Sequence, residues 1–349
     1  MKKLFFSLVA LMCATISYAQ SSLIATLSHD GEISTFYGSS ALREAHEAAQ
    51  HGDIITLSSG SFTSVNITKA ITLRGAGMQV DTLAKTNPTI ITGDFEINIP
   101  DSVEQRLTVE GLYINDIITV TSLNNASFLK DRIKNIHITG NSMYNSSMNN
   151  ITFIHCKISA FYNTYNGNSG SNSASFVNCY VTLNGGGTYN YEYNRNMEFT
   201  NCYVRFGYTN HLSFLSFYNC IIYATANESS EIYHCLSSNC VANYCLAICS
   251  YDDLFKNVPN NTSNSYLSGN FNTLFKTYTG NYTDEETFEL TDEAKAKYLG
   301  SDGTEVGIHG GSLPFDPTPT NPQITKCNVA SKSTADGKLS VDIEVSATE

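Results

Sequence analysis

A short phrase that returns several times in the middle of the chain constrains the fold more than any other feature. It reads FVNCYVT at 176–182, FTNCYVR at 199–205 and FYNCIIY at 217–223. Each copy places an apolar residue, a spacer, Asn-Cys, a second spacer and another apolar residue in the same order. Repetition at short intervals is typical of repeat proteins, in which each copy is one structural unit stacked on the next.

Alignment of these phrases with related stretches gives one column that is first Gly and later Cys. The interval of 18 residues recurs in it, and insertions lengthen other intervals. Such spacing is typical of the coils of a β-solenoid and is shorter than the roughly 33 to 47 residues of helical repeats. The column consists of Gly75, Gly93, Gly111, Gly140, Cys156, Cys179, Cys202, Cys220 and Cys235.

The Asn of the phrase is predicted to form a corner between two short strands. Strand side chains alternate between the two faces, so Phe176 would point inward. Cys179 and Val181 form the next inward pair, and the alternation therefore shifts by one residue at Asn178. A residue in the left-handed region of the backbone produces this shift, and Asn adopts that region more readily than most side-chain-bearing residues. The same corner is predicted at Asn201, Asn219, His155 and His234.

Stacking of identical corners would place the cysteines in a row. Successive coils lie about 4.8 Å apart, whereas a disulfide needs Cβ atoms about 3.8 Å apart with converging bonds. A ladder of buried free thiols is the preferred interpretation, and some disulfides or a metal site are the alternatives. The metal alternative has a spacing unlike that of common zinc sites, and we predict no metal and no cofactor. The candidate ligands of the alternative metal site would be His234, Cys235, Cys240, Cys245 and Cys249.

Residues 1–19 are predicted to be a secretory signal peptide. Two lysines precede an apolar stretch at 4–16, and Ser17-Tyr18-Ala19 supplies small residues before the cleavage point. The alternative is a lipoprotein signal that ends at Cys13. Because no later apolar run approaches the roughly 20 residues of a membrane-spanning helix, we expect a secreted or cell-surface protein without a transmembrane segment after cleavage.

The charge balance argues against one class of partner. The formal net charge is −12, and signal cleavage would make it two units more negative. Like charge opposes the approach of DNA, RNA and acidic glycans, so no nucleic-acid partner is expected. Charged residues make up only 15% of the chain, which leaves Asn, Ser, Thr and Tyr to form most of the polar surface.

Both ends of the repeat carry segments that would close a solenoid. The stretch SSALREAHEAAQHGD at 39–53 predicts a helix with Ser40 as N-cap. With the strands DIITLSSGSF and ITKAITLRGAG that follow, it resembles the opening of right-handed parallel β-helices of the pectate-lyase-like superfamily. LGSDGTEVGIHGG at 299–311 resembles the closing segment of secreted bacterial members. The apolar face of the helix would consist of Leu42, Ala45, Ala48 and Ala49.

The resemblance covers about residues 39–311 and implies the fold. We predict an all-β, right-handed, single-stranded parallel β-helix with an N-terminal capping helix and a C-terminal β-hairpin tail. The hairpin has a turn at Asp336-Gly337 and, being marginal alone, must contact the solenoid, meet a partner or belong to a sandwich. The predicted boundaries are 1–19 for the signal peptide, 20–312 for the β-helix, 313–323 for a Pro-rich linker and 324–349 for the tail. Within the β-helix, regular coils are expected at about 54–249. A C-terminal cover is expected at 250–312, with a helix at 292–297.

Catalytic motifs of the superfamily are not found in the sequence. The resemblance implies that many members cleave polysaccharides, with clustered acidic Ca²⁺ ligands and an Arg base in pectate lyases and Asp-rich motifs in polygalacturonases. Arg74, Asp94 and Glu110 lie near one column, but singly. The Asp-Asp pair at 252–253 falls after the regular coils. The two corner histidines are interpreted as structural because Asn takes their place in neighbouring coils.

Insertions after the second strand of successive coils form the predicted binding surface. AFYNTYNGNSGSNS, LNGGGTYNYEYNRN and FGYTNHLS should emerge side by side because the coils stack. Aromatic faces pack on sugar rings and amides bond hydroxyls, so we expect non-catalytic binding of a neutral glycan or cell-surface protein. The alternatives are a polysaccharide lyase or glycoside hydrolase with an unrecognised active site, and a structural or adhesin shaft. The candidate binding residues are Tyr162, Tyr165, Asn166, Tyr189, Asn190, Tyr191, Tyr193, Asn194 and Tyr208.

Overall fold

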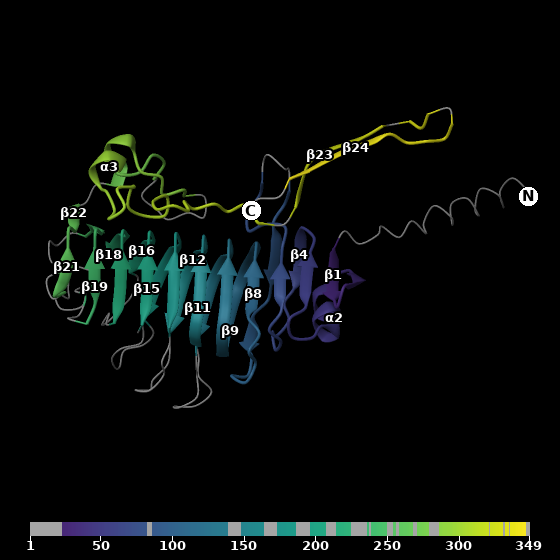
Figure 1. The fold of residues 1–349 in the computed structure, drawn as a ribbon, viewed down its shortest axis with the longest axis horizontal. Coiled ribbons are helices and arrows are strands. Elements are labelled where there is room, and N and C mark those ends of the chain that lie inside the picture. The colour runs from purple at the N-terminus through teal and green to yellow at the C-terminus, as the bar shows by residue number, and fades with distance from the viewer. Residues whose placement is uncertain are drawn as a thin grey trace, which may run out of the picture.

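The computed structural model of the chain is a parallel β-helix built from stacked coils (Figure 1). Two long sheets, sheet A and sheet B, run along the stack, and each strand pairs with the equivalent strands of the coils before and after it. The predicted fold class is confirmed. The structure describes residues 23–81, 86–138, 148–163, 173–185, 196–206, 214–224, 236, 239–249, 254–255, 258–267, 271–278, 286–320, 322–330, 332–334 and 336–346.

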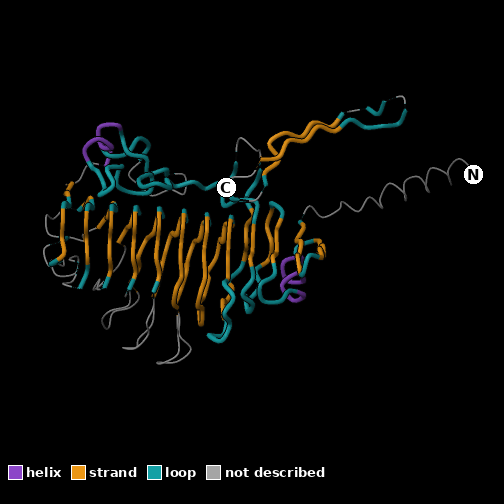
Figure 2. The backbone as a smooth tube through the Cα atoms, viewed as in Figure 1, coloured by secondary structure: helices purple, strands orange, loops and turns teal. Residues whose placement is uncertain are grey.

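From β10 on, successive strands alternate between the two sheets. Figure 2 shows the strands side by side along the length of the molecule. Sheet A contains β1 (Ile24–His29), β2 (Glu32–Tyr37), β3 (Ile54–Leu57), β5 (Thr72–Arg74), β8 (Leu107–Glu110), β11 (Met148–Ile154), β13 (Ala174–Val177), β15 (Met197–Thr200), β17 (Leu215–Tyr218), β19 (Val241–Asn243) and β21 (Asn260–Thr262). Sheet B contains β4 (Gly60–Thr63), β6 (Thr89–Thr92), β7 (Phe95–Asn98), β10 (Arg132–Ile138), β12 (Lys157–Asn163), β14 (Tyr180–Gly185), β16 (Tyr203–Phe206), β18 (Ile221–Ala224), β20 (Leu246–Ile248) and β22 (Ser265–Leu267). The long strand β9 (Leu112–Leu129) pairs in both sheets.

The corner that leads from sheet A to sheet B has the predicted left-handed backbone. Asn178, Asn201 and Asn219 have φ values of 48°, 51° and 55°, and His155 has 54°. Without a residue that tolerates this region, the inward alternation could not restart after the corner. We call this row of residues the exit column, which also includes Gly111, Lys130, Tyr244 and Ser263.

The position after the exit column carries the cysteine ladder, and its membership differs from the prediction. The register places Cys156, Cys179, Cys202 and Cys220 in line, followed by Cys245 rather than Cys235. Asp131 occupies the coil before Cys156. Gly75 and Gly111 lie one position earlier, in line with the corner, and Gly93 lies between β6 and β7 of sheet B. Gly140 and Cys235 are outside the described residues.

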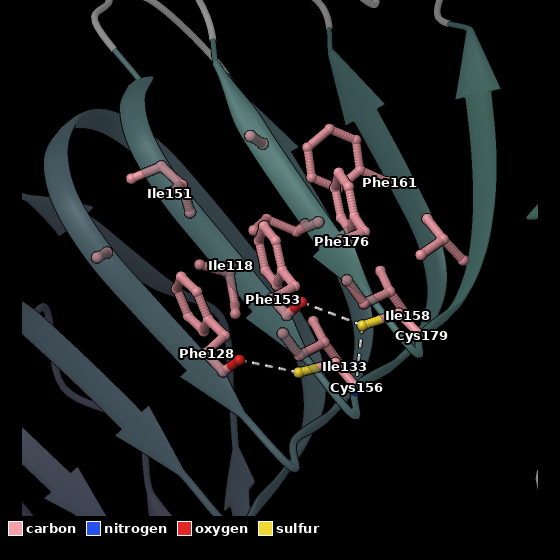
Figure 3. Packing of buried hydrophobic residues seen from close by; sticks show 14 of the residues in the cluster. Ile118, Phe128, Ile133, Ile151, Phe153, Cys156, Ile158, Phe161, Phe176 and Cys179 are labelled. Atoms are coloured by element: carbon pink, nitrogen blue, oxygen red, sulfur yellow. Dashed lines mark hydrogen bonds between the residues drawn. The ribbon is translucent and has the colours of Figure 1, made fainter. Parts of the chain in front are cut away.

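The interior of the solenoid is a stack of identical side chains (Figure 3). On sheet A, five phenylalanine rings lie parallel, with adjacent ring centroids 4.6 to 5.0 Å apart. Burial of such large side chains in every coil is the main stabilising contribution, at roughly 25 cal/mol per Å² of apolar surface removed from water. The rings belong to Phe128, Phe153, Phe176, Phe199 and Phe217.

The N-terminal end is closed by a helix and by a hairpin that the sequence did not predict. Helix α2 (Ala41–Ala48) buries Leu42 and Ala45 as expected, but Ala48 is exposed and His46 is buried in its place. Ser40 is the N-cap residue without a capping side-chain bond, since its hydroxyl donates to Glu44 Oε1 at 2.6 Å. Strands β1 and β2 pair antiparallel before the helix, and β1 also pairs antiparallel with β3.

The C-terminal cover packs on the outer face of sheet B. Regular coils continue to Leu267, beyond the predicted limit of 249. A 3₁₀ turn η1 (Phe271–Thr273) and helix α3 (Asp292–Lys297), which confirms the predicted helix, contribute to this cover. Buried residues of the cover form a second core with outward side chains of sheet B. The cover contributes Phe275, Phe288, Leu290 and Ala294, and sheet B contributes Tyr180, Tyr203, Ile221 and Leu246.

Residues 299–320, here called the strap, return along the solenoid toward its N-terminal third (Figure 1). The predicted Pro-rich linker is therefore partly docked on the coils. The tail follows as two antiparallel strands, β23 (Gln323–Val329) and β24 (Val341–Ser346), and confirms the predicted hairpin. In the part of the chain that the structure describes, no helix has the length and apolarity needed to cross a bilayer.

Candidate functional site

The strand ends that lead into the predicted binding insertions are neighbours in sheet B. Register pairs join Ile138 to Asn163 and Asn163 to Gly185. Leu183 pairs with Phe206, which pairs in turn with Ala224. The strand ends that precede consecutive insertions therefore lie at one edge of the sheet, in two rows offset by two residues on β14, and adjacent strands are about 4.8 Å apart. A ligand that binds this edge can contact several coils at once.

Tyr162 is the one predicted binding residue within the described part of the chain. It lies half-buried on β12, in register with His137 of β10 and Asn184 of β14. Its ring contacts that of His137 edge-on, with centroids 4.6 Å apart. Burial lowers the pKa of His137, while the charge of Asp94 acts in the opposite direction. The other predicted binding residues, Tyr165, Asn166, Tyr189, Asn190, Tyr191, Tyr193, Asn194 and Tyr208, lie outside the described residues.

A second row of outward side chains lies next to the corner of sheet B. The guanidinium carbon of Arg132 lies 4.0 Å from the ring centroid of Tyr113, which is its register partner on β9. The hydroxyl of Tyr113 donates to Asn115 Oδ1 at 2.6 Å. A cation held over an aromatic face restrains both groups. No repeated phrase of the sequence marks this row, and only the observed register shows that its members are partners.

Lys157 continues that row where the C-terminal cover begins. It is 6% exposed, and its ammonium lies 5.6 Å from the ring centroid of Phe315. Burial lowers the pKa of Lys157 to about 8, with a further lowering by the charge of Arg132 and an opposing effect from Glu286. Lys157 therefore loses its proton at a lower pH than a solvated lysine does.

Two carboxylates are held in fixed positions beside the same surface. Asp116 Oδ2 accepts a hydrogen bond of 2.7 Å from the backbone of Gly93, and Asp94 Oδ1 accepts one of 3.1 Å from Ile117. The backbone donors orient both groups without neutralising them. Asp94 had been considered as a catalytic candidate with Arg74 and Glu110, but the structure separates it from them.

Arg74 and Glu110 form a structural pair on sheet A. Their strands are in register, and Arg74 Nε lies 3.3 Å from Glu110 Oε2. Glu110 is 2% exposed, and its other oxygen accepts a hydrogen bond of 2.8 Å from the backbone of Thr320 in the strap. A carboxylate covered in this way does not reach a ligand. His155 likewise serves the strap, as its Nε2 donates to the carbonyl of Leu313 at 3.1 Å.

The cysteines of the ladder are free thiols, as predicted for those that the structure describes. The backbone N–H of Cys156 donates to Cys179 Sγ at 3.3 Å, and the thiol of Cys156 donates to the carbonyl of Phe128 at 3.3 Å (Figure 3). Asn264 makes the same two kinds of contact at the end of the ladder. No group of three or more potential metal ligands occurs among the described residues, which do not include His234, Cys235 and residues 252–253.

The fold defines the chain as a single-chain parallel β-helix with a docked C-terminal strap. No family model matches it, and no curated protein or solved structure shows significant similarity to it. Its function is therefore inferred from the arrangement of its own residues.

Proposed function

We propose that this chain is an exported, cell-surface or secreted β-helix of the pectate-lyase-like type that binds a neutral glycan without cleaving it. The binding surface consists of the insertions that follow sheet B, together with the outward residues at their base. The observation that carries the proposal is the pairing of the strand ends at one edge of sheet B: Ile138, Asn163 and Gly185 form one row, and Leu183, Phe206 and Ala224 form a second row two residues earlier on β14. Insertions that follow neighbouring strand ends would contribute their Tyr and Asn residues to one surface.

The described residues at the base have side chains suited to a sugar. Tyr162 offers a half-buried ring beside His137, and Asn184 offers an amide in the next coil. Aromatic faces cover the apolar faces of sugar rings, and amides bond their hydroxyl groups. An acidic chain would not repel a neutral glycan, whereas it would oppose an acidic one.

A glycan array probed with the full chain tests the proposal. The Tyr189→Ala/Tyr191→Ala/Tyr193→Ala variant should bind any glycan hit at least about tenfold more weakly, and Tyr162→Ala several-fold more weakly. Tyr37→Ala is the matched control, because Tyr37 is 51% exposed on β2 at the N-terminal end of the solenoid. Equal binding by all three variants and the unmodified chain would remove the insertions from the site.

A second candidate function is cleavage of the bound polysaccharide. The observation that favours it is that Asp94 and Asp116 are each oriented by a backbone N–H next to the other carboxylate, and that the charge of Asp94 acts on His137. Paired carboxylates are the usual machinery of glycoside hydrolysis. Product analysis separates the two candidates, since new reducing ends or unsaturated products from an array hit would replace the binding function by a catalytic one.

A further inference from the structure

The strap lies along the exit column over most of the solenoid. It runs from the C-terminal coils back toward the N-terminal coils. The backbone N–H of Gly307 donates to the carbonyl of Asn219 at 2.9 Å. Asn178 then donates from its amide to the carbonyls of Ile308 and Gly310, at 2.9 and 2.8 Å. The column side chains thus bind the backbone of a segment that lies more than 80 residues away in the sequence.

A glycine allows the strap to pass close to the column. Gly311 has φ +81°, and a Cβ atom placed on it would lie 2.1 Å from Asn201 Nδ2. Only glycine combines this backbone conformation with so close an approach. The strap is therefore shaped to fit the column at this point.

Two polar contacts hold the Pro-rich end of the strap. Lys130 Nζ lies 3.2 Å from Asp316 Oδ2 and also donates to the carbonyl of Thr318. One coil further on, the backbone and the hydroxyl of Thr320 both donate to Glu110 Oε1. We call these two contacts the latch. Lys130 is itself 13% exposed and Glu110 2% exposed, so the strap replaces the water that would otherwise solvate them.

The two halves of the strap differ in how they are anchored. Val306 and Ile308 are buried in the second core with the C-terminal cover. Beyond them, Leu313 is 63% exposed, while Phe315 still packs against the edge of the second core. After Phe315, the segment to Thr320 is held by the latch and by the buried Pro319. Segments with few buried apolar contacts open at a lower free energy than the core they lie on.

We propose that residues 316–320 form a clasp that opens at the latch while the solenoid stays folded. When the clasp is closed, Pro319 packs on Gly77 and Gly111, and the hairpin tail begins above the N-terminal third of the solenoid. When the clasp is open, the nearest anchor of the tail is Phe315, at the edge of the second core. The clasp therefore controls where the tail is presented, and this inference stands independently of the glycan-binding proposal.

Hydrogen–deuterium exchange of the full chain tests the clasp. The amides of Thr318 and Thr320 are bonded to Asp316 and Glu110, so their exchange reports on opening. They should exchange at least about tenfold faster than the amides of β14 and β16 in the unmodified chain. Lys130→Met should accelerate their exchange a further several-fold and leave β14 and β16 unchanged. Lys134→Met is the matched control, because Lys134 is an exposed lysine on the adjacent strand β10.

Asp316→Asn gives a second test that leaves the column intact, since Asp316 is 43% exposed and belongs to the strap. It should raise exchange at Thr318 as Lys130→Met does. Exchange of the strap and of β14 at one common rate would show a single cooperative unit and overturn the proposal. Unchanged exchange at Thr318 in both latch variants would overturn it as well.

Discussion

The side-chain amide of Asn178 donates a hydrogen bond of 2.8 Å to the carbonyl oxygen of Gly310, 132 residues further along the chain. Asn178 is 1% exposed and its backbone is left-handed, with φ 48°. One residue therefore makes the corner of a coil and fixes the strap to it. A second row of left-handed residues, which includes Asn125 and Asn150, lies at the corner that leads into sheet A. These side chains bond to each other and not to the strap, since the amide of Asn150 donates to Asn125 Oδ1 at 2.7 Å.

This difference predicts unequal effects for two matched substitutions. Asn178→Gly keeps a residue suited to positive φ but leaves the carbonyls of Ile308 and Gly310 without their donor, which should cost about 1 to 3 kcal/mol. Asn150→Gly removes an exposed contact at φ 55° and should cost only about half as much or less. Chemical denaturation of the two variants measures the difference, and equal losses would contradict the role of Asn178 in holding the strap.

Sequence reasoning predicted the corner at Asn178 because backbone preference is a local property. The shift in alternation between Phe176 and Cys179 requires a left-handed residue regardless of what lies outside the coil. The partners of the amide were not predictable in this way. Nothing near Asn178 indicates that Ile308 and Gly310 return to it, because the return depends on the packing of the cover on sheet B.

The predicted cysteine column was wrong at Cys235 and at its glycines because the sequence does not show which residues of different coils are in register. Insertions vary in length, so aligning short phrases does not fix which residue faces which across a coil. Asp131 stands in line with Cys156 because its Oδ1 accepts the backbone N–H of Leu112 at 2.8 Å, the role that each thiol plays toward the preceding coil. A pattern of apolar and small residues does not show that a carboxyl can take that role. Burial holds the pKa of Asp131 well above its usual range, which favours the neutral acid.

The candidate site was also predictable only in part from the sequence. The stacking of coils follows from the repeat, and the strand ends that precede the insertions are neighbours in sheet B. The stacking of the insertions themselves stays a prediction, because they lie outside the described residues. The row of Tyr113, Arg132 and Lys157 was missed because its members differ in type from coil to coil, so no repeated phrase marks them. Their shared feature is the outward phase of sheet B, which needs the corner position to be known first.

The thiols of the ladder should resist modification in the native protein. Cys156, Cys179, Cys202 and Cys220 are fully buried, and burial raises the pKa of the Cys156 thiol well above its usual value. Because the thiolate is the reactive species, iodoacetamide should label Cys156 at least about tenfold more slowly than the half-buried Cys249. Mass spectrometry of the labelled peptides measures this, with labelling in guanidinium as the control. Labelling of Cys156 and Cys249 at one rate in the native protein would contradict the ladder.

Phe214 occupies a corner that Asn takes in other coils. Its φ is 57°, and the equivalent Asn196 has φ 53°. A bulky side chain in this region costs about 1 to 2 kcal/mol, and Asn is among the residues that tolerate it best. Because Phe214 is 38% exposed, Phe214→Asn should raise the unfolding free energy by about 1 kcal/mol and Asn196→Phe should lower it by a similar amount. Thermal unfolding of both variants checks the two opposite signs, and a loss in each would show that the Phe214 ring contributes more than its backbone costs.

His46 makes the capping helix sensitive to acid. It is 5% exposed on α2, and its Nε2 accepts a hydrogen bond of 3.4 Å from the backbone of Thr68. Burial, aided by the charge of Lys69, lowers the pKa of His46 to about 4 from the ordinary 6.5. The unfolded chain therefore binds the proton more readily, and the contribution of His46 to stability is complete above about pH 6.5 and is lost as the pH falls toward 4.

The expected loss over that interval is about 3 kcal/mol, because each pKa unit corresponds to roughly 1.4 kcal/mol. His46→Gln keeps an acceptor for Thr68 and has no proton to gain. Its stability should match that of the unmodified chain within about 0.5 kcal/mol at pH 7 and exceed it by about 2 kcal/mol at pH 4.5. Denaturation at both pH values measures the two differences. Parallel curves for the two proteins would mean that His46 is solvated in the folded state, and the helix could not then close the end of the core as the structure shows.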